Sequence, residues 1–132
     1  GMQLLFGESE EFGRHEGVGF FSGKVVRFPG DMPAPGGGVL KVPHMGWNAI
    51  EILAEHPVLS GIPSGTFFYF VHSYHAVPGE PGIMACRAEY GFPFTAAVGK
   101  GNRFAVQFHP EKSQSAGLRL LGNFGRLCAE AA

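Results

Sequence analysis

A histidine and a glutamate two residues apart, His109 and Glu111, are the side chains of this sequence best suited to proton-transfer chemistry. At that spacing the carboxylate can hydrogen-bond one ring nitrogen of the histidine and leave the other nitrogen free to act as a base. A histidine oriented by a carboxylate supplies two of the three members of a nucleophilic triad. Taken alone, an H-x-E triplet is more often a surface pair in a turn, so the surrounding elements decide between the two interpretations.

The residues before this pair predict a strand that ends beside it. Apolar and polar side chains alternate from Phe104 to Phe108, which is typical of a half-buried strand. Pro110 has no amide hydrogen to donate to a strand ladder. We therefore expect the strand to stop there and to present His109 at its end.

Other segments predict a chain rich in short strands and turns. We expect strands at residues 24–28, 39–43, 48–53, 66–72, 83–90 and 94–98. The run 66–72 is continuously aromatic and β-branched, which predicts burial on both faces. We expect a helix at residues 1–6, loops at 7–23 and 31–38, a single helical turn at 56–59 and one long helix from about 116 to 129. Leu118, Leu121, Phe124 and Leu127 recur in that helix at helical spacing.

The composition fits one soluble globular domain or part of one. Of 132 residues, 45% are hydrophobic and 16% charged, and the net charge of −1 gives no electrostatic case for nucleic acid or membrane binding. No segment resembles a signal peptide or a membrane span, so we expect a cytoplasmic protein. Cys86 and Cys128 are far apart and fit no zinc spacing. We expect both to be buried free thiols rather than nucleophiles, since neither follows a sharp glycine-bounded turn.

Three histidines, His44, His72 and His75, are close enough in type and order to raise the question of a metal site. Residues three apart in an extended run point to opposite faces, which separates His72 from His75. No cysteine or carboxylate completes the set. We therefore expect no metal and no other cofactor.

Four segments resemble one family in the order in which they occur. They are G-M-Q-L-L-F at residues 1–6, H-M-G-W-N at 44–48, Y-F-V-H-S-Y at 69–74 and Q-F-H-P-E-K-S at 107–113. The last is typical of class I glutamine amidotransferases in general. The middle two resemble the glutaminase subunits of imidazole glycerol phosphate synthase, an enzyme of histidine biosynthesis. The four segments span most of the chain, which argues against coincidence.

The resemblance implies an α/β fold of the flavodoxin-like, three-layer type with a central, mostly parallel sheet. Residues 1–132 would form its C-terminal part, namely the strand-rich half and the C-terminal helix. In the family the cysteine nucleophile sits in a G-x-C-x-G-M-Q turn, and residues 1–3 match the end of that turn. We therefore expect the nucleophile and the preceding strands to lie outside this chain, and the chain alone to be inactive.

The resemblance also implies the reaction and its residues. Glutamine would be hydrolysed to glutamate and ammonia through a thioester, with His109 as the base and Glu111 orienting it. By resemblance, Gln3, Ser73 and Tyr74 would bind the amino-acid end of glutamine. The ammonia would pass to a cyclase subunit with a (β/α)₈ barrel. The residues implied to contact that partner are His44, Met45, Gly46, Trp47 and Asn48.

Two alternatives to this function remain open on the sequence. The chain could belong to another class I glutamine amidotransferase with a different partner. It could also be a short, non-catalytic relative that binds a partner and needs no cysteine. A further expectation concerns the chain by itself: loss of the parallel core would bare sheet edge and apolar surface, so we expect self-association.

Overall fold

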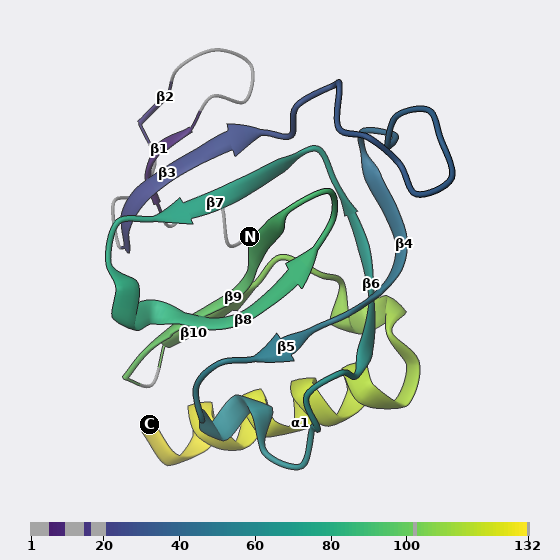
Figure 1. Ribbon diagram of the computed structural model, residues 1–132. Helices are drawn as coiled ribbons and strands as arrows, with labels where there is room; N and C mark the ends of the chain where they lie inside the picture. Colours follow the sequence, from purple (N-terminus) through teal and green to yellow (C-terminus); the bar gives the residue numbers. More distant parts are fainter. Residues whose placement is uncertain (1–5, 10–14, 17–20, 102, 132) are drawn as a thin grey trace.

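The structure is a computed structural model that describes residues 6–9, 15–16, 21–101 and 103–131 (Figure 1). The described strands are β1 (Phe6–Ser9), β2 (His15–Glu16), β3 (Phe21–Arg27), β4 (His44–Ala49), β5 (Glu51–Ile52), β6 (Phe67–His72), β7 (Tyr74–Pro78), β8 (Met84–Glu89), β9 (Pro93–Lys100) and β10 (Arg103–Val106). Short 3₁₀ turns are η2 (Pro57–Leu59), η3 (Pro81–Ile83) and η4 (Pro110–Lys112), and the long helix is α1 (Gln114–Ala131). None of the helices in these residues is long and apolar enough to cross a membrane.

The strands form three sheets whose order brings distant segments together. One sheet has the order β2-β1-β3-β7, a second has the order β10-β9-β8-β5, and β4 pairs with β6 alone. The β4–β6 pair is antiparallel and sets His44 opposite His72. The β3–β7 pair sets Arg27 opposite Tyr74. Because β6 and β7 are separated only by Ser73, the chain passes from one sheet to another at that residue.

The core is built from phenylalanine rings supplied by the different sheets. Phe28, Phe68, Phe70, Phe94 and Phe108 are almost completely buried in one cluster. Their rings meet at edge-on or tilted angles, as in the Phe70–Phe94 pair with centroids 5.7 Å apart at 85°. Burying a large aromatic side chain contributes about 2–3 kcal/mol, so this cluster is the main source of stability.

Strand β6 is buried on one face only, which corrects the expectation from its composition. Phe68 and Phe70 are fully buried, whereas Phe67 is 58% exposed. The side chains alternate because β4 and β6 form a two-stranded sheet with one face on the core and the other open. A continuously apolar run therefore marks here an exposed apolar face and not a strand covered on both sides.

Helix α1 begins and ends two residues beyond the expected limits and lies along one side of the strands, next to η2 (Figure 1). Its inward face carries Leu120, Leu127 and the buried Asn123, whose amide donates to the carbonyls of Val58 at 2.9 Å and Ser60 at 2.8 Å. The polar Asn123 side chain thus has hydrogen-bond partners for its core position, and the Ser60 carbonyl also accepts from Arg119 Nε at 3.3 Å. Three residues of the expected apolar face are exposed: Leu118, Leu121 and Phe124.

Several expectations about secondary structure and about the cysteines are wrong in the described residues. Phe6–Ser9 and His15–Glu16 are short strands, in place of the expected helix end and loop. Residues 39–43 form no strand beyond a single bridge between Pro33 and Val39. Cys128 is exposed and only Cys86 is buried. The expected elements at 24–28, 56–59, 66–72, 83–90 and 94–98 are confirmed within a few residues of their ends.

Candidate active site

His109 lies just beyond the end of β10 and is held by strand β6. The strand ends at Val106, earlier than expected, although the Gln107 N–H still donates to the Ala96 carbonyl at 2.8 Å. The backbone N–H of His109 donates to the carbonyl of Tyr69 at 2.9 Å. Pro110 then starts the 3₁₀ turn η4, as its fixed φ and missing N–H favour. The histidine is thus anchored to β6 by its backbone while its side chain remains free to react.

Ser113 gives this anchor a second contact. Its hydroxyl donates to the His109 carbonyl at 2.6 Å and accepts from the Tyr69 N–H at 3.0 Å. The side chain is 2% exposed, so both bonds are shielded from water. A serine directly before a long helix commonly caps its first turn. In the structure the Ser113 hydroxyl instead fixes the position of His109 on β6, a role that needs the tertiary structure to be recognised.

The expected pairing of His109 with Glu111 is confirmed. Nδ1 of His109 lies 2.7 Å from Oε1 of Glu111, with 36% and 58% of the two side chains exposed. A hydrogen bond from its own backbone N–H, followed by the bond to His109 and the charges of His109 and Lys112, lowers the pKa of Glu111 despite slight burial. The carboxylate is therefore ionised at neutral pH and can only accept, so Nδ1 carries the hydrogen. Nε2 is left with a lone pair that can take a proton.

The two thiols lie in elements other than the segment that carries His109. Cys86 is fully buried in β8, and that burial raises the pKa of its thiol to about 12. Cys128 is exposed, in the last turns of α1. Within the described part of the chain, the side-chain hydrogen bonds around His109 run to Glu111 and Ser113 and not to either sulfur. The expected His109–Glu111 pair is present, and its hydrogen bonds reach neither thiol.

The residues expected to bind substrate are only partly described. Gln3 lies outside the described residues. Ser73 links β6 to β7, and its carbonyl accepts from the Phe28 N–H at 3.0 Å. Tyr74 opens β7 and is half-buried. Both follow directly on the strand that anchors His109, so the segment expected to bind substrate and the expected base share one support.

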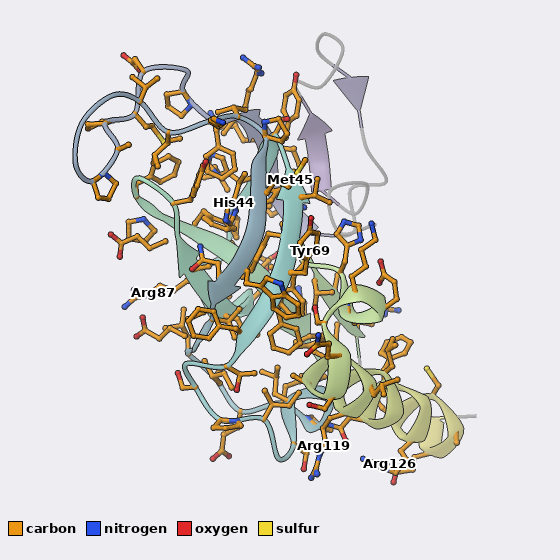
Figure 2. The ribbon with its side chains drawn as sticks, turned by 90° about the vertical axis from the view of Figure 1, so that its right-hand side faces the viewer. His44, Met45, Tyr69, Arg87, Arg119 and Arg126 are labelled. Carbon is orange, nitrogen blue, oxygen red and sulfur yellow. The ribbon has the colours of Figure 1, made fainter. Side chains whose placement is uncertain are left out.

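Strand β4 presents its alternate residues on opposite faces. Met45 and Trp47 are 62% and 47% exposed, and the Trp47 ring meets Tyr69 edge-on with centroids 5.9 Å apart. Lys112 lies 6.0 Å from the centroid of the same Tyr69 ring. Figure 2 shows Met45 and Tyr69 on the paired strands β4 and β6. With Phe67, these residues form an exposed apolar face with one basic side chain, which we call the β4–β6 outer face.

The opposite face of β4 packs inward. His44 is 4% exposed and Asn48 is half-buried, so Met45 and Trp47 are the most exposed of the five residues expected to contact a partner. His44 hydrogen-bonds His72, and the Phe28 ring packs on both His72 and His75. The expectation that His72 and His75 point to opposite faces is wrong, because the alternation shifts at Ser73. Among the described residues no three His, Cys, Asp or Glu side chains could hold a metal ion.

These buried histidines are neutral at physiological pH. Burial, with a smaller contribution from His72, lowers the pKa of His44 to about 4. Burial also lowers the pKa of His72 to about 4, with smaller contributions from His75 and His109 that add to it and a bond to the Tyr74 carbonyl that opposes it. Burial lowers the pKa of His75 as well. Each ring therefore has one N–H and one acceptor nitrogen.

A histidine beside a strand end, hydrogen-bonded to a carboxylate, fits the class of protein that the family comparison identifies. The family described as glutamine amidotransferase class-I matches residues 1–126, and the chain belongs to it. Its fold is that of this class, in the form of strand-rich sheets with a C-terminal helix. The crystal structure of a Thermoplasma acidophilum protein described as part of a GMP synthase shares the fold, with a TM-score of 0.61 at 19% identity over 83% of this chain and 50% of that one.

Curated relatives give a closer comparison. The imidazole glycerol phosphate synthase subunit HisH of Syntrophotalea carbinolica is 58% identical over 125 residues, which are 95% of this chain and 60% of that protein. The HisH subunit of Methylococcus capsulatus is 53% identical over 127 residues, or 96% of this chain and 58% of that protein. The chain thus spans about three fifths of the length of these relatives.

Proposed function

We propose that this chain carries the base of a glutaminase that serves as the glutamine amidotransferase subunit of imidazole glycerol phosphate synthase. The observation that supports it is the 2.7 Å bond between His109 Nδ1 and Glu111 Oε1. It leaves Nε2 as the proton acceptor on a histidine that is tied to β6. The 58% identity to the HisH subunit of Syntrophotalea carbinolica supports the assignment to this subunit.

In this proposal a cysteine thiol gives its proton to Nε2 of His109 and attacks the amide carbon of glutamine. The resulting imidazolium is stabilised by the Glu111 carboxylate and returns the proton to the departing ammonia. Water then hydrolyses the thioester with the same histidine as base. The thiol comes from the part of the relatives that these 132 residues do not span, because Cys86 is buried with a raised pKa and Cys128 lies far along α1.

Substrate and partner occupy two sides of the β4–β6 pair in this proposal. Gln3, Ser73 and Tyr74 hold the amino-acid end of glutamine. Met45 and Trp47 on the β4–β6 outer face contact the cyclase subunit, which receives the ammonia. Exposed Trp and Met side chains are enriched at the centres of protein interfaces, which supports this use of the face.

The test is a hybrid enzyme in which this chain replaces the matched segment of the Syntrophotalea carbinolica HisH subunit. Mixed with the cyclase subunit of that organism, the hybrid enzyme is expected to release glutamate from glutamine, whereas the 132-residue chain alone is expected to release none. Glutamate is measured with glutamate dehydrogenase. Activity of the chain alone would show that one of its own thiols is the nucleophile. A hybrid that folds but neither binds the cyclase nor hydrolyses glutamine would favour a different amidotransferase or a non-catalytic relative.

The 132-residue chain by itself is proposed to self-associate. Leu118, Leu121 and Phe124 are 71%, 44% and 40% exposed on the outer face of α1, close together at helical spacing. In sedimentation velocity at micromolar concentration the chain is expected to run as a dimer or larger species. A Leu118→Asp/Phe124→Ser variant, changed only at exposed positions, is expected to shift toward monomer. A chain that sediments only as a monomer would contradict this proposal.

A further inference from the structure

Four groups on the inner face of the β4–β6 pair form one buried hydrogen-bond chain. The Asn48 amide nitrogen lies 3.4 Å from Nε2 of His44, and Nδ1 of His44 lies 3.0 Å from Nε2 of His72. Nδ1 of His72 lies 2.9 Å from the carbonyl oxygen of Tyr74. His44 and His72 are only 4% and 7% exposed. This hydrogen-bond chain therefore runs through the core from β4 to the first residue of β7.

The direction of this chain follows from its two ends. The Tyr74 carbonyl can only accept, so Nδ1 of His72 carries the hydrogen. His72 is neutral, which leaves Nε2 as an acceptor for the Nδ1–H of His44. His44 is neutral as well, so its Nε2 accepts from the Asn48 amide, whose other hydrogen goes to the Glu89 carbonyl at 2.8 Å. Every donor in this hydrogen-bond chain has an acceptor. Only one tautomer of each imidazole ring, the one with hydrogen on Nδ1, allows all of these bonds.

Aromatic rings hold the two imidazoles in place. His44 is stacked between Phe70, with centroids 5.1 Å apart, and Tyr90, with centroids 4.0 Å apart, both at 24°. His72 meets Phe28 edge-on at 5.1 Å and lies tilted against Phe94 at the same distance. A ring flanked in this way cannot turn without displacing core side chains. The hydrogen-bond chain is thus fixed by packing as well as by its own bonds.

The hydrogen-bond chain ends at the Tyr74 carbonyl, next to the residue that links β6 to β7. The Ser73 carbonyl accepts from the Phe28 N–H at 3.0 Å, and the Tyr74 carbonyl accepts from His72. Because peptide units are planar, fixing these carbonyls also fixes the directions of the N–H groups of Tyr74 and His75. Phe28 and His72 together therefore set the backbone of Ser73 and Tyr74.

We propose that His72 is a positioning residue for glutamine, fixing the Ser73–Tyr74 backbone and tying it through His44 to the strand that carries Met45 and Trp47. The inference rests on the proposed function, in which Ser73 and Tyr74 hold the substrate. Loss of the His72 side chain removes its hydrogen bond to the Tyr74 carbonyl and leaves His44 without its acceptor. Glutamine then binds a less ordered segment, while His109 keeps its separate support from Tyr69 and Ser113.

The hydrogen-bond chain also connects the two sides of β4. Met45 and Trp47 lie on the outer face, and the residues just before and just after them, His44 and Asn48, lie on the inner face. The His44–His72 and His72–Tyr74 bonds therefore join the strand that carries Met45 and Trp47 to the segment at Ser73 and Tyr74.

Steady-state kinetics of the hybrid enzyme with its cyclase subunit test the positioning role. His72→Phe is expected to raise KM for glutamine about tenfold or more and to change kcat less than about threefold. In His72→Asn the amide N–H replaces Nδ1–H toward the Tyr74 carbonyl, and most of the KM increase is expected to disappear. His75→Phe is the matched control, since His75 is equally buried and packs on the same Phe28 ring but lies outside the hydrogen-bond chain.

Two results would overturn the proposal: equal KM changes in His72→Phe and His75→Phe, or a loss confined to kcat. An inactive unsubstituted hybrid would instead refute the proposed function, and NMR of the 132-residue chain would then decide the positioning role. Imidazole nitrogen shifts are expected to show the Nδ1–H tautomer in both His44 and His72. His72→Phe is expected to shift the Ser73 and Tyr74 amide signals more than His75→Phe does. An Nε2–H tautomer of either ring, or equal amide shifts, would contradict it.

Discussion

Replacing His109 with alanine is expected to lower kcat of the hybrid enzyme for glutamine hydrolysis by roughly 10³-fold or more, with little change in KM. The reason is that one imidazole serves three proton transfers in the proposed mechanism: from the thiol, to ammonia and from water. Its position depends on backbone and Ser113 contacts that alanine leaves in place. The loss is therefore one of chemistry and not of folding, and it is measured as glutamate release at saturating glutamine.

Two further variants separate the roles in this site. Glu111→Ala removes only the group that orients the imidazole, so a smaller loss of about 10- to 10²-fold in kcat is expected. His56→Asn is the matched control, because His56 caps η2 through Nδ1 and asparagine is also a good cap. A His109→Ala enzyme that kept most of its activity would refute the assignment of this residue as the base.

The His109–Glu111 pair could be predicted from the sequence because its geometry is local. The two groups lie two positions apart, and Pro110 between them limits the backbone to a few conformations. The prediction did not need the rest of the fold to be correct. The strand before it is in fact shorter than expected, yet the 2.7 Å bond is present.

The features that the sequence did not predict depend on contacts between distant segments. Whether β6 is covered on one face or two depends on which strands pair with it, and its composition fits both. The common burial of His72 and His75 follows from the change of sheet at Ser73, which shifts the alternation by one residue. Asn123 is satisfied in a core position of α1 because its amide donates to the carbonyls of Val58 and Ser60 on a distant segment. Helical periodicity alone predicts leucines, and not an asparagine, on the side of α1 that faces the core.

The β4–β6 pair is the element on which the proposed functions converge. Its outer face offers Met45 and Trp47, and its inner face carries the His44–His72 bond. The Tyr69 backbone holds His109 from one edge of β6. A single two-stranded sheet therefore supports the proposed base, the proposed substrate segment and the proposed partner surface, and disturbing any one of them is expected to affect the others.

Acidification from about pH 7 to about pH 4.5 is expected to lower the free energy of unfolding of the chain by roughly 2–5 kcal/mol. The pKa values of His44 and His72 are about 4 in the folded chain, against 6.5 ordinarily. As the pH falls below about 6.5 the unfolded chain takes up protons that the folded chain does not, so stability is lost through this window. Urea unfolding at several pH values, followed by Trp47 fluorescence, measures how steeply the free energy of unfolding changes with pH.

The groups around these histidines determine how the slope is interpreted. His44 faces Tyr90, Phe70, Phe94 and His72, and His72 faces Phe28, Phe94, His75 and the more distant His109. His75 also has a lowered pKa and adds a slope of the same sign.

The pKa values of the Glu51 and Glu111 carboxyls are also lowered. These two groups change the pH dependence of stability mainly below about pH 4.5, outside the range in which the histidines act. A His44→Phe/His72→Phe variant is expected to be less stable at neutral pH, because Asn48 and the Tyr74 carbonyl lose partners, but to have a clearly flatter slope. An equally steep slope in the variant would mean that these two rings are not the neutral, directional pair on which the positioning of Tyr74 depends.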